Sequence, residues 1–379
     1  MRVQVAALAA ALLLGACQER PNIGTPPDEP AAPSLKSAYQ GDFVIGAAID
    51  APEITGADAK DDAIIASQFN AISPENALKW ESVHPQPGTY DFTLADQYVD
   101  FGVKHHMYIV GHVLVWHNQT PAWVFHDDNG NLLTRDALLA RLKDHIMTVV
   151  GRYKGRINSW DVVNEALNED GTLRQSLWYK IIGPDYIEKA FEYAHEADPS
   201  ALLNYNDYSI VNAPKRAGVV ALISKLKSEG IPVGSVGIQG HYNLDWPSTD
   251  QLDETISDFA KLGVKVAITE LDMDVLPPAT KQQTAEVTLN IAQNAGLNPY
   301  VNGLPDAVAQ QEAERYAALF RVFLKHKDAI SRVTLWGVTD ASSWRNNWPI
   351  RGRTAYPLLF DRDGKPNASY DAVLKVAGE

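Results

Sequence analysis

The stretch Ile157-Asn-Ser-Trp-Asp-Val-Val-Asn-Glu165 joins a short apolar run to a polar end. A run of this length that is rich in valine and isoleucine favours a strand buried in a parallel sheet. Comparable runs recur from Tyr39 onward and alternate with longer amphipathic stretches. This alternation is the pattern of repeated strand–helix units, so the stretch predicts one strand of a larger α/β sheet.

Eight strands are predicted in one unbroken series, and helices separate them. The strands are expected at 43–49, 66–72, 107–112, 157–163, 202–206, 236–239, 266–270 and 333–338. The helices are expected at 94–104, 134–153, 186–197, 214–229, 251–262, 306–327 and 370–376. Such a series favours a single (β/α)8 TIM barrel over an open doubly wound sheet. No predicted strand runs into a GxGxxG turn, so the dinucleotide-binding form of the open sheet lacks its phosphate cradle.

Length and composition agree with one large domain. Barrels of this kind reach about 250 to 400 residues as a single unit, which accommodates the 379 residues of the chain. Hydrophobic residues make up 45% of the sequence, and its 9 Trp and 15 Tyr leave aromatic rings for ligand contacts. The formal net charge of -14 opposes binding to nucleic acid or anionic lipid, because phosphates are recognised by clustered Lys and Arg. A neutral substrate fits better.

The N-terminus has the pattern of an export signal. Arg2 precedes the apolar run Val5-Ala-Ala-Leu-Ala-Ala-Ala-Leu-Leu-Leu14, which is too short to span a bilayer. We therefore expect a signal peptide at 1–16. The following Leu14-Gly-Ala-Cys17 resembles the lipobox of bacterial lipoproteins, in which the cysteine becomes acylated after cleavage. Cys17 is the only cysteine, so no intrachain disulfide can form.

The segment 17–38 is expected to be a tether. It contains several prolines and few apolar side chains, a composition that favours extended, solvated backbone. A lipidated Cys17 and this linker would connect the membrane to a catalytic domain at 39–379, with no membrane contact other than the acyl chains. An aspartate directly after the lipidated cysteine often retains a lipoprotein at the inner membrane. This chain has Gln18 at that position, which favours anchoring in the outer membrane.

Polar residues and tryptophans follow the predicted strands at the same end of each strand. In a barrel these ends converge on one face, where active sites lie. One such motif alone is often only a cap or loop, but seven in register indicate a site. The motifs are Ser73-Pro-Glu-Asn-Ala-Leu-Lys-Trp80, Gly111-His-Val-Leu-Val-Trp-His117, Trp160-Asp-Val-Val-Asn-Glu165, Asn204-Tyr-Asn-Asp-Tyr208, Gly237-Ile-Gln-Gly-His241, Ile268-Thr-Glu-Leu-Asp272 and Leu335-Trp-Gly-Val-Thr-Asp340.

Two of these motifs place carboxylates that can face each other across the barrel mouth. Glu165 follows the fourth predicted strand, and Glu270 ends the seventh. Glycoside hydrolysis requires such a pair, and a separation of roughly 5 to 5.5 Å leads to retention of configuration. Repulsion between close carboxylates is expected to keep one of them protonated, which is the state that a general acid needs.

Four of the motifs together resemble the signatures of glycoside hydrolase family 10 xylanases, and the resemblance runs from about 40 to 375. They are Gly111-His-Val-Leu-Val-Trp116, Asp161-Val-Val-Asn-Glu165, Ile268-Thr-Glu-Leu-Asp272 and Trp336-Gly-Val-Thr-Asp340. The resemblance implies a retaining endo-β-1,4-xylanase that acts on xylan and xylo-oligosaccharides. It also implies that Glu165 is the acid/base and Glu270 the nucleophile. Neither a cofactor nor a metal is expected, and the enzyme is expected to be a monomer.

The resemblance further implies sugar-binding roles for ten residues around this pair. Indole rings stack on flat sugar faces, and hydroxyl groups call for Asn, Gln, Lys and His partners. By matching position, the glycone side would be lined by Glu75, Asn76 and Lys79, and the sugar next to the scissile bond would contact His112 and Trp116, with Asn164 at its 2-hydroxyl. The rest of the site would be completed by Gln239 and His241, and His241 would orient the nucleophile. The sugar under attack would lie against Trp336 and Trp344. Asn118, where serine is common, and a long loop after Asp272 depart from the family pattern.

Other interpretations of the same residues stay open. A metal-dependent hydrolase could use His112, His117 and His241, although the first predicted strand lacks the His-x-His that such barrels usually place there. A non-catalytic polysaccharide-binding lipoprotein could also keep an aromatic cleft, although it would not need both glutamates. Some aromatic and polar residues are ambiguous: Trp80, Trp160 and Trp178 are expected to pack in the core, and Tyr205 and Asn206 either touch substrate or support the glutamates.

Overall fold

The structure, a computed structural model, describes residues 33–280 and 286–379. The predicted signal peptide, the predicted lipidation site Cys17 and most of the expected tether, up to residue 32, lie outside the described residues. One compact unit spans Ser34–Glu379. Within the described residues, no helix is both long and apolar enough to cross a bilayer.

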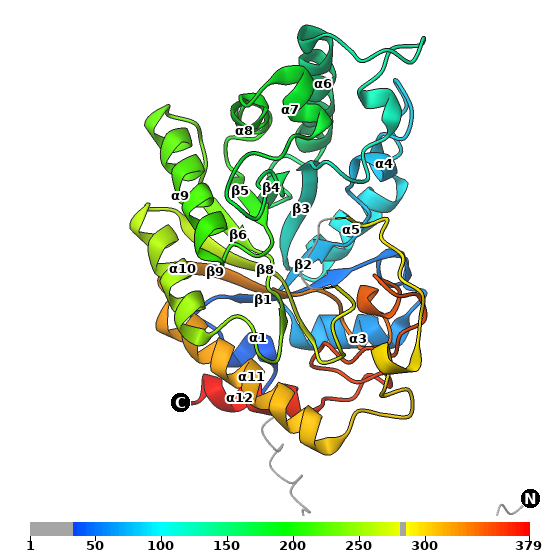
Figure 1. Cartoon of the computed structure of the whole chain (residues 1–379), viewed down its shortest axis with the longest axis vertical. Helices are drawn as coiled ribbons and strands as arrows, with labels where there is room; N and C mark the ends of the chain where they lie inside the picture. Colours follow the sequence, from blue (N-terminus) through cyan, green and yellow to red (C-terminus); the bar gives the residue numbers. More distant parts are fainter. Residues whose placement is uncertain (1–32, 281–285) are drawn as a thin grey trace, which may run out of the picture. The chain divides into compact units, whose positions relative to one another are not determined.

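Eight parallel strands close into a barrel, as predicted (Figure 1). They are β1 (Val44–Ile49), β2 (Ala71–Pro74), β3 (Tyr108–Val115), β4 (Ser159–Asn164), β5 (Leu202–Asp207), β6 (Ser235–Ile238), β8 (Lys265–Asp274) and β9 (Ile330–Leu335). Neighbours pair in chain order from β1 to β6, and the β6–β8, β8–β9 and β9–β1 pairings close the ring. A short strand, β7 (His241–Asn243), pairs with the end of β8 and extends that strand's edge at the barrel mouth.

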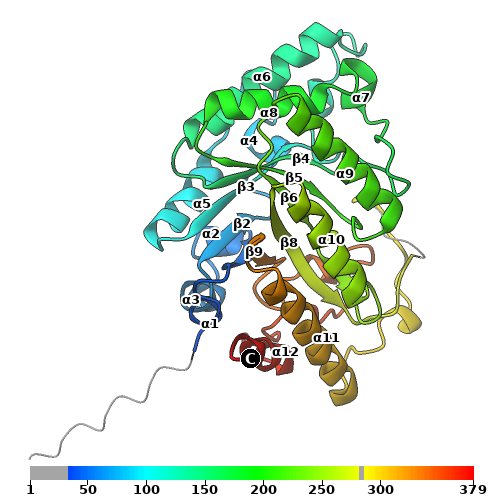
Figure 2. The ribbon, with the colours of Figure 1, turned by 90° about the vertical axis from the view of Figure 1, so that its left-hand side faces the viewer.

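Helices cover the outside of the strands (Figure 2). They are α1 (Leu35–Ala38), α2 (Ala51–Ile54), α3 (Ala59–Gln68), α4 (Trp80–Val83), α5 (Thr93–Lys104), α6 (Arg135–Arg152), α7 (Leu177–Ile182), α8 (Tyr186–Ala197), α9 (Ala213–Ser228), α10 (Thr249–Lys261), α11 (Asp306–Lys325) and α12 (Ala368–Ala377). Their starts follow from local side chains. Thr134 caps α6 by accepting from Ala137 N, and Ser248 and Gln251 form a capping box at α10.

Most predicted strand boundaries differ from the observed ones: β3 continues to Val115 and β8 to Asp274, beyond the predicted ends at 112 and 270, and two other strands are displaced along the chain. The strand expected at 66–72 begins inside α3, which runs to Gln68, and β2 starts only at Ala71. Asp58 caps α3 through two backbone amides, and Asp61 and Ile65 face inward four residues apart, so the helical period overrides the apolar run. The strand expected at 333–338 is β9, which ends at Leu335 because the chain then turns into the loop at the barrel mouth.

The compact unit also starts earlier than residue 39. Ser34 caps α1 with its side chain, and Leu35 is fully buried. Next to this helix, Tyr39 donates its hydroxyl proton to Val373 O at 2.7 Å, which ties the start of the unit to α12. The last residues of the expected tether therefore belong to the folded domain, because one leucine and one cap are enough to fix a single helical turn against the barrel.

Below the mouth, the barrel interior contains a buried ion pair. Arg332 Nη2 of β9 lies 3.3 Å from Asp161 Oδ1 of β4, and each side chain is 2% exposed. Asp161 also accepts from Asn204 Nδ2 at 2.7 Å and lies 2.9 Å from His112 Nδ1. Since a buried charge must be paired, this network fixes β3, β4, β5 and β9 relative to one another just beneath the strand ends.

Candidate active site

A cleft of about 950 Å³ opens at the C-terminal ends of the strands. It contains every cleft residue that the sequence predicted. These residues are Glu75, Asn76, Lys79, His112, Trp116, Asn164, Glu165, Gln239, His241, Glu270, Trp336 and Trp344. The strand ends bring them together because parallel strands in a barrel all point their carboxyl ends to one face.

Glu165 follows the last residue of β4 and is only 6% exposed. Its carboxylate accepts from Trp116 Nε1 at 2.8 Å and from Gln239 Nε2 at 2.9 Å. Burial raises the pKa of this carboxyl, and the negative charges of Asp207 and Glu270 raise it further against the two hydrogen bonds. The Glu165 carboxyl therefore holds its proton to higher pH than an exposed glutamate does.

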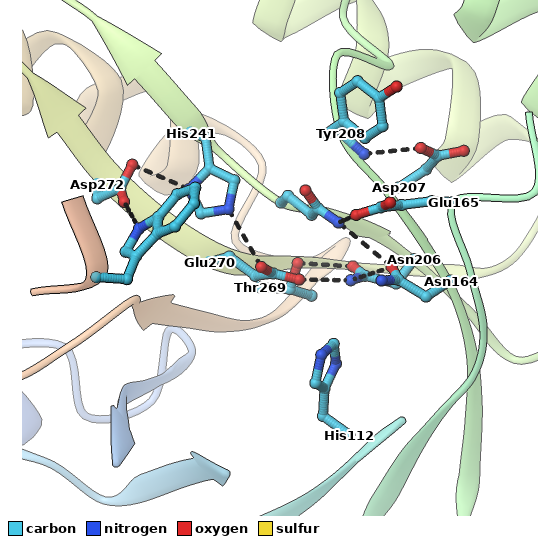
Figure 3. Close-up of polar contacts among 12 residues, drawn as sticks. His112, Asn164, Glu165, Asn206, Asp207, Tyr208, His241, Thr269, Glu270 and Asp272 are labelled. Atoms are coloured by element: carbon cyan, nitrogen blue, oxygen red, sulfur yellow. Dashed lines mark hydrogen bonds and ion pairs between the residues drawn. The ribbon is translucent and has the colours of Figure 1, made fainter. Parts of the chain in front are cut away.

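Glu270 lies on β8, is 5% exposed, and is held from two sides (Figure 3). Asn206 Nδ2 donates to its Oε1 at 2.7 Å, and His241 Nε2 lies 3.2 Å from its Oε2. Asn206 therefore supports a glutamate, which settles one of the open sequence interpretations. The Asn206 side chain has room for this contact because residue 237 on β6 is a glycine, and a Cβ there would overlap Asn206 Oδ1.

His241 is clamped between two carboxylates. Its Nδ1 lies 3.0 Å from Asp272 Oδ1, and Asp272 also accepts from Trp344 Nε1 and Arg345 Nη2, both at 2.8 Å. Burial would raise the pKa of Asp272, but Arg345 and His241 hold it well below its usual range. Burial would lower the pKa of His241, yet Asp272 and Glu270 raise it to about 9. The imidazole is therefore a cation at neutral pH and donates from both nitrogens.

A second polar group lines another part of the cleft. Lys79 Nζ donates to Asn76 Oδ1 at 3.0 Å and to Gln119 Oε1 at 2.6 Å. Asn76 Nδ2 donates to Asp50 Oδ2 at 3.1 Å. Burial, together with the charge of Asp50, raises the pKa of Glu75 to about 7. These side chains offer a fixed set of donors and acceptors of the kind that sugar hydroxyls bind.

Indole rings line the same cleft as the glutamates. Trp336 lies edge-on to His112 at 5.4 Å between ring centroids, and Trp344 lies 5.0 Å from His241. Trp348 stacks on Trp344 at 4.9 Å with an interplanar angle of 18°. A planar apolar face beside converging polar groups is suited to a pyranose ring, which has an apolar face and a polar edge.

The sequence also matches a protein family along nearly its whole length. The profile of Glycosyl hydrolase family 10 matches residues 34–376. The chain belongs to this family. The resemblance that the four motifs indicated is therefore confirmed, together with the barrel.

Several family 10 relatives are similar over almost their full length. "Endo-1,4-beta-xylanase A" of Xylanibacter ruminicola is 43% identical over 344 residues, which are 91% of this chain and 93% of that protein. "Beta-1,4-xylanase" of Dictyoglomus thermophilum is 41% identical over 345 residues, 90% of this chain and 91% of that protein. The solved structure of a GH10 endoxylanase from a sugarcane soil metagenome has a TM-score of 0.88 and 47% identity, and covers 90% of this chain and 100% of that chain.

The cleft of this family 10 member includes residues that sequence reasoning missed. Gln119, Tyr208, Trp246, Tyr300 and Trp348 also line it. Tyr208 ends a motif quoted above, which was a usable signal. The others lie in irregular loops, where no periodicity indicates the direction of a side chain. By contrast, Trp80, Trp160 and Trp178 are at most 2% exposed and pack in the core, as predicted.

Histidines do not gather into a ligand cluster. Among the described residues, the side chains close enough to share one ion are Glu53, Asp58 and Asp61, and none of them is a histidine. His112 and His241 instead contact Asp161 and the Glu270–Asp272 pair. The arrangement that the metal-dependent alternative needs is thus absent from the part of the chain described here.

Proposed function

We infer that this family 10 protein is a retaining endo-1,4-β-xylanase, with Glu165 as the general acid/base and Glu270 as the nucleophile. One observation carries the assignment: two buried glutamates share a cleft but have opposite surroundings. Glu165 has a raised pKa, whereas Glu270 accepts from Asn206 and faces the cationic His241. The relatives named endo-1,4-β-xylanases support xylan as the substrate.

In the first step the Glu270 carboxylate attacks the anomeric carbon and the bond to the leaving oxygen breaks. The Glu165 carboxyl gives its proton to that oxygen, so the leaving chain departs as an alcohol. An ester between Glu270 and the sugar remains. The hydrogen bonds from Asn206 and His241 hold the Glu270 oxygens in place throughout this step, which keeps the reacting atoms aligned without reorganisation.

In the second step water attacks the same carbon and gives its proton to Glu165, and the ester bond to Glu270 breaks. Glu165 can now act as a base because esterification has removed the negative charge of Glu270, one of the charges that raise its pKa. Two displacements at one carbon restore the β configuration. The same carboxyl thus changes role as the charge of its neighbour changes.

Sugar binding is assigned along the cleft. Glu75, Asn76 and Lys79 bind hydroxyls on the glycone side, and Trp336 and Trp344 hold the ring that is attacked. His112, Trp116 and Asn164 bind the same sugar, and Gln239 and His241 complete the site. The shared cleft lining and the hydrogen bonds from Trp116 and Gln239 to Glu165 support these roles.

We also propose that the enzyme is exported as a lipoprotein on Cys17 and anchored in the outer membrane. The lipobox-like Leu14-Gly-Ala-Cys17 and the prolines after it support this placement. A tether would let the catalytic domain reach an insoluble polymer while the acyl chains stay in the membrane.

The test of the catalytic assignment compares xylan with an aryl xylobioside whose phenolate leaves without protonation. Glu270→Ala should be nearly inactive on both substrates. Glu165→Ala should lose about 10²- to 10⁴-fold on xylan but keep the first step on the aryl substrate. Added azide should then release a β-glycosyl azide from the trapped intermediate. The exposed Glu314→Ala serves as the control and should change neither rate.

Two results contradict the assignment. If Glu165→Ala is equally inactive on both substrates and does not respond to azide, Glu165 is not the acid/base. If the azide product has the α configuration, the reaction does not pass through a glycosyl ester on Glu270.

A further inference from the structure

Glu165 has an unusual backbone. Its φ is 56°, which lies in the left-handed region that residues other than glycine rarely adopt. Such a conformation persists only when the surroundings hold it in place. Here both main-chain polar groups are held: Glu165 N donates to Asn206 O at 2.9 Å, and Glu165 O accepts from Arg174 Nε at 2.9 Å.

Arg174 forms this contact from the returning arm of the loop that follows β4. Leu167 and Leu173 pair as an antiparallel bridge, and Arg174 N donates to Ala166 O at 2.7 Å. The loop therefore folds back on itself and brings residue 174 beside residue 165. A half-buried guanidinium in this position can reach several groups at once, because its donors spread in a rigid plane.

The guanidinium joins the loops after two strands. Besides Glu165 O, its Nη2 donates to Leu167 O at 3.2 Å and to Tyr208 Oη at 3.1 Å. Tyr208 follows β5 and lines the cleft. The Tyr208 amide donates to Asp207 Oδ1 at 2.9 Å (Figure 3), and the charge of Asp207 raises the pKa of Glu165. Arg174 thus links the acid's main chain to a cleft-lining side chain on the neighbouring strand.

We propose that Arg174 is a positioning residue for the general acid, holding the strained Glu165 backbone and the Tyr208 hydroxyl so that the Glu165 carboxyl faces the leaving oxygen. The inference rests on the proposed role of Glu165. Arg174 acts through Glu165 and Tyr208 and does not itself line the cleft. Its positive charge also interacts with the Glu165 carboxylate, so losing the charge should favour the protonated acid.

The experiment measures kcat and KM of Arg174→Ala and Arg174→Lys on xylan and on the activated aryl xylobioside. On xylan, Arg174→Ala should lose roughly ten- to a hundred-fold in kcat with KM nearly unchanged, since a charge-assisted contact that aligns the acid is gone. On the aryl substrate the first step should stay within about three-fold, because a phenolate needs no proton. Low millimolar guanidinium should restore part of the activity on xylan.

The pH profile separates charge from geometry. The alkaline limb of kcat/KM on xylan reports loss of the acid's proton. It should move to higher pH in Arg174→Ala, because the nearby cation is gone, and stay in place in Arg174→Lys, which keeps the charge but not the forked donors. Arg141→Ala is the matched control: Arg141 also donates to main-chain carbonyls of a loop, at Val124 O and His126 O, but lies outside the cleft lining.

The outcomes distinguish this inference from the proposed function. Suppose that Arg174→Ala loses the same factor in kcat on both substrates, or keeps its full kcat on both, while Glu165→Ala still shows its substrate split and azide response. In either case the positioning role of Arg174 is wrong and the proposed function stands. If Glu165→Ala fails its own test, the function is wrong. Should Arg174→Ala unfold, Arg174→Lys carries the test, and a loss on xylan without a loss on the aryl substrate supports the inference.

Discussion

At the residue scale, two chemically identical glutamates acquire different roles from their surroundings. The sequence predicted that mutual repulsion would keep one of them protonated. For Glu165 the structure places burial first, the charge of Asp207 next, and the charge of Glu270 after both among the causes that raise its pKa. Desolvation dominates because the charged form loses water on every side, whereas a neighbouring anion acts from one direction only.

The two cleft tryptophans can be tested by truncation. Trp336→Ala and Trp344→Ala should each lower kcat/KM on xylan several-fold, because an aromatic contact contributes about 0.5 to 1.5 kcal/mol beyond area burial. Trp344→Phe separates two effects, since it keeps a ring but loses the hydrogen bond from Nε1 to Asp272. Trp123→Phe, which loses a similar bond to Pro85 O outside the cleft, is the control. Unchanged kinetics in both alanine variants would assign these rings a packing role only.

At the element scale, most boundaries follow from local signals, and the exceptions have physical causes. Capped helices such as α6 and α10 begin where the sequence places a threonine or serine. The predicted second strand starts too early because residues 66–68, Ala-Ser-Gln, form the last turn of α3 and the buried strand residues begin only at Ala71. A propagating helix gains one hydrogen bond for each added residue, so the capped α3 continues until the chain must enter the barrel.

Helix α11 contains a buried acid that couples stability to pH. Glu312 is 2% exposed, and its Oε1 has no hydrogen-bond partner within the part of the chain that the structure describes. Burial, with help from the charge of Asp340, raises its pKa well above the ordinary value of 4.5. The folded state therefore keeps a proton that the unfolded state loses. The stability that the bound proton contributes is fully present below about pH 4.5 and is lost as pH rises toward the folded-state pKa of Glu312.

We expect Glu312→Gln to remove this dependence. An amide of similar shape carries no titrating proton, so the variant should lose less stability above pH 5 and be more stable than the parent in alkaline buffer. The unfolding free energy of Glu312→Gln minus that of the parent should grow by up to about 1.4 kcal/mol for each unit that the pH rises. Tm measured across this range checks it, with the exposed Glu314→Gln on the same helix as the control. Parallel Tm curves for parent and Glu312→Gln would contradict the expectation.

At the scale of the whole molecule, the enzyme combines a barrel with an N-terminal segment whose predicted role is anchoring. Cys17→Ser should move the protein from the membrane fraction to the soluble fraction without changing kcat on soluble xylo-oligosaccharides, because the catalytic domain is untouched. Gln18→Asp should keep the anchor and shift the protein toward the inner membrane. Fractionation with mass spectrometry of the N-terminal peptide checks both variants. A wholly soluble parent with an unmodified Cys17 would exclude the lipoprotein proposal.

The sequence by itself determined the repeated strand–helix units and the residues that stand at the strand ends. These features are local: the apolar period sets the element, and the barrel's geometry sends every strand end to one face. Glu165 and Glu270 could therefore be named before any coordinates. Trp116, Gln239 and His241 could be named as site residues as well, through the resemblance of their motifs to family 10.

Only the tertiary structure decided how those residues differ from one another. The depth of burial that raises the pKa of Glu165, the Arg174 contact that holds its left-handed backbone, and the stacking of Trp348 on Trp344 all depend on how irregular loops fold. No sequence period extends across such loops, and desolvation depends on every chain segment that covers a group rather than on its neighbours in sequence. That is why the sequence motifs could name an acid/base and a nucleophile through their resemblance to family 10, while the physical difference between the two carboxyls depends on packing.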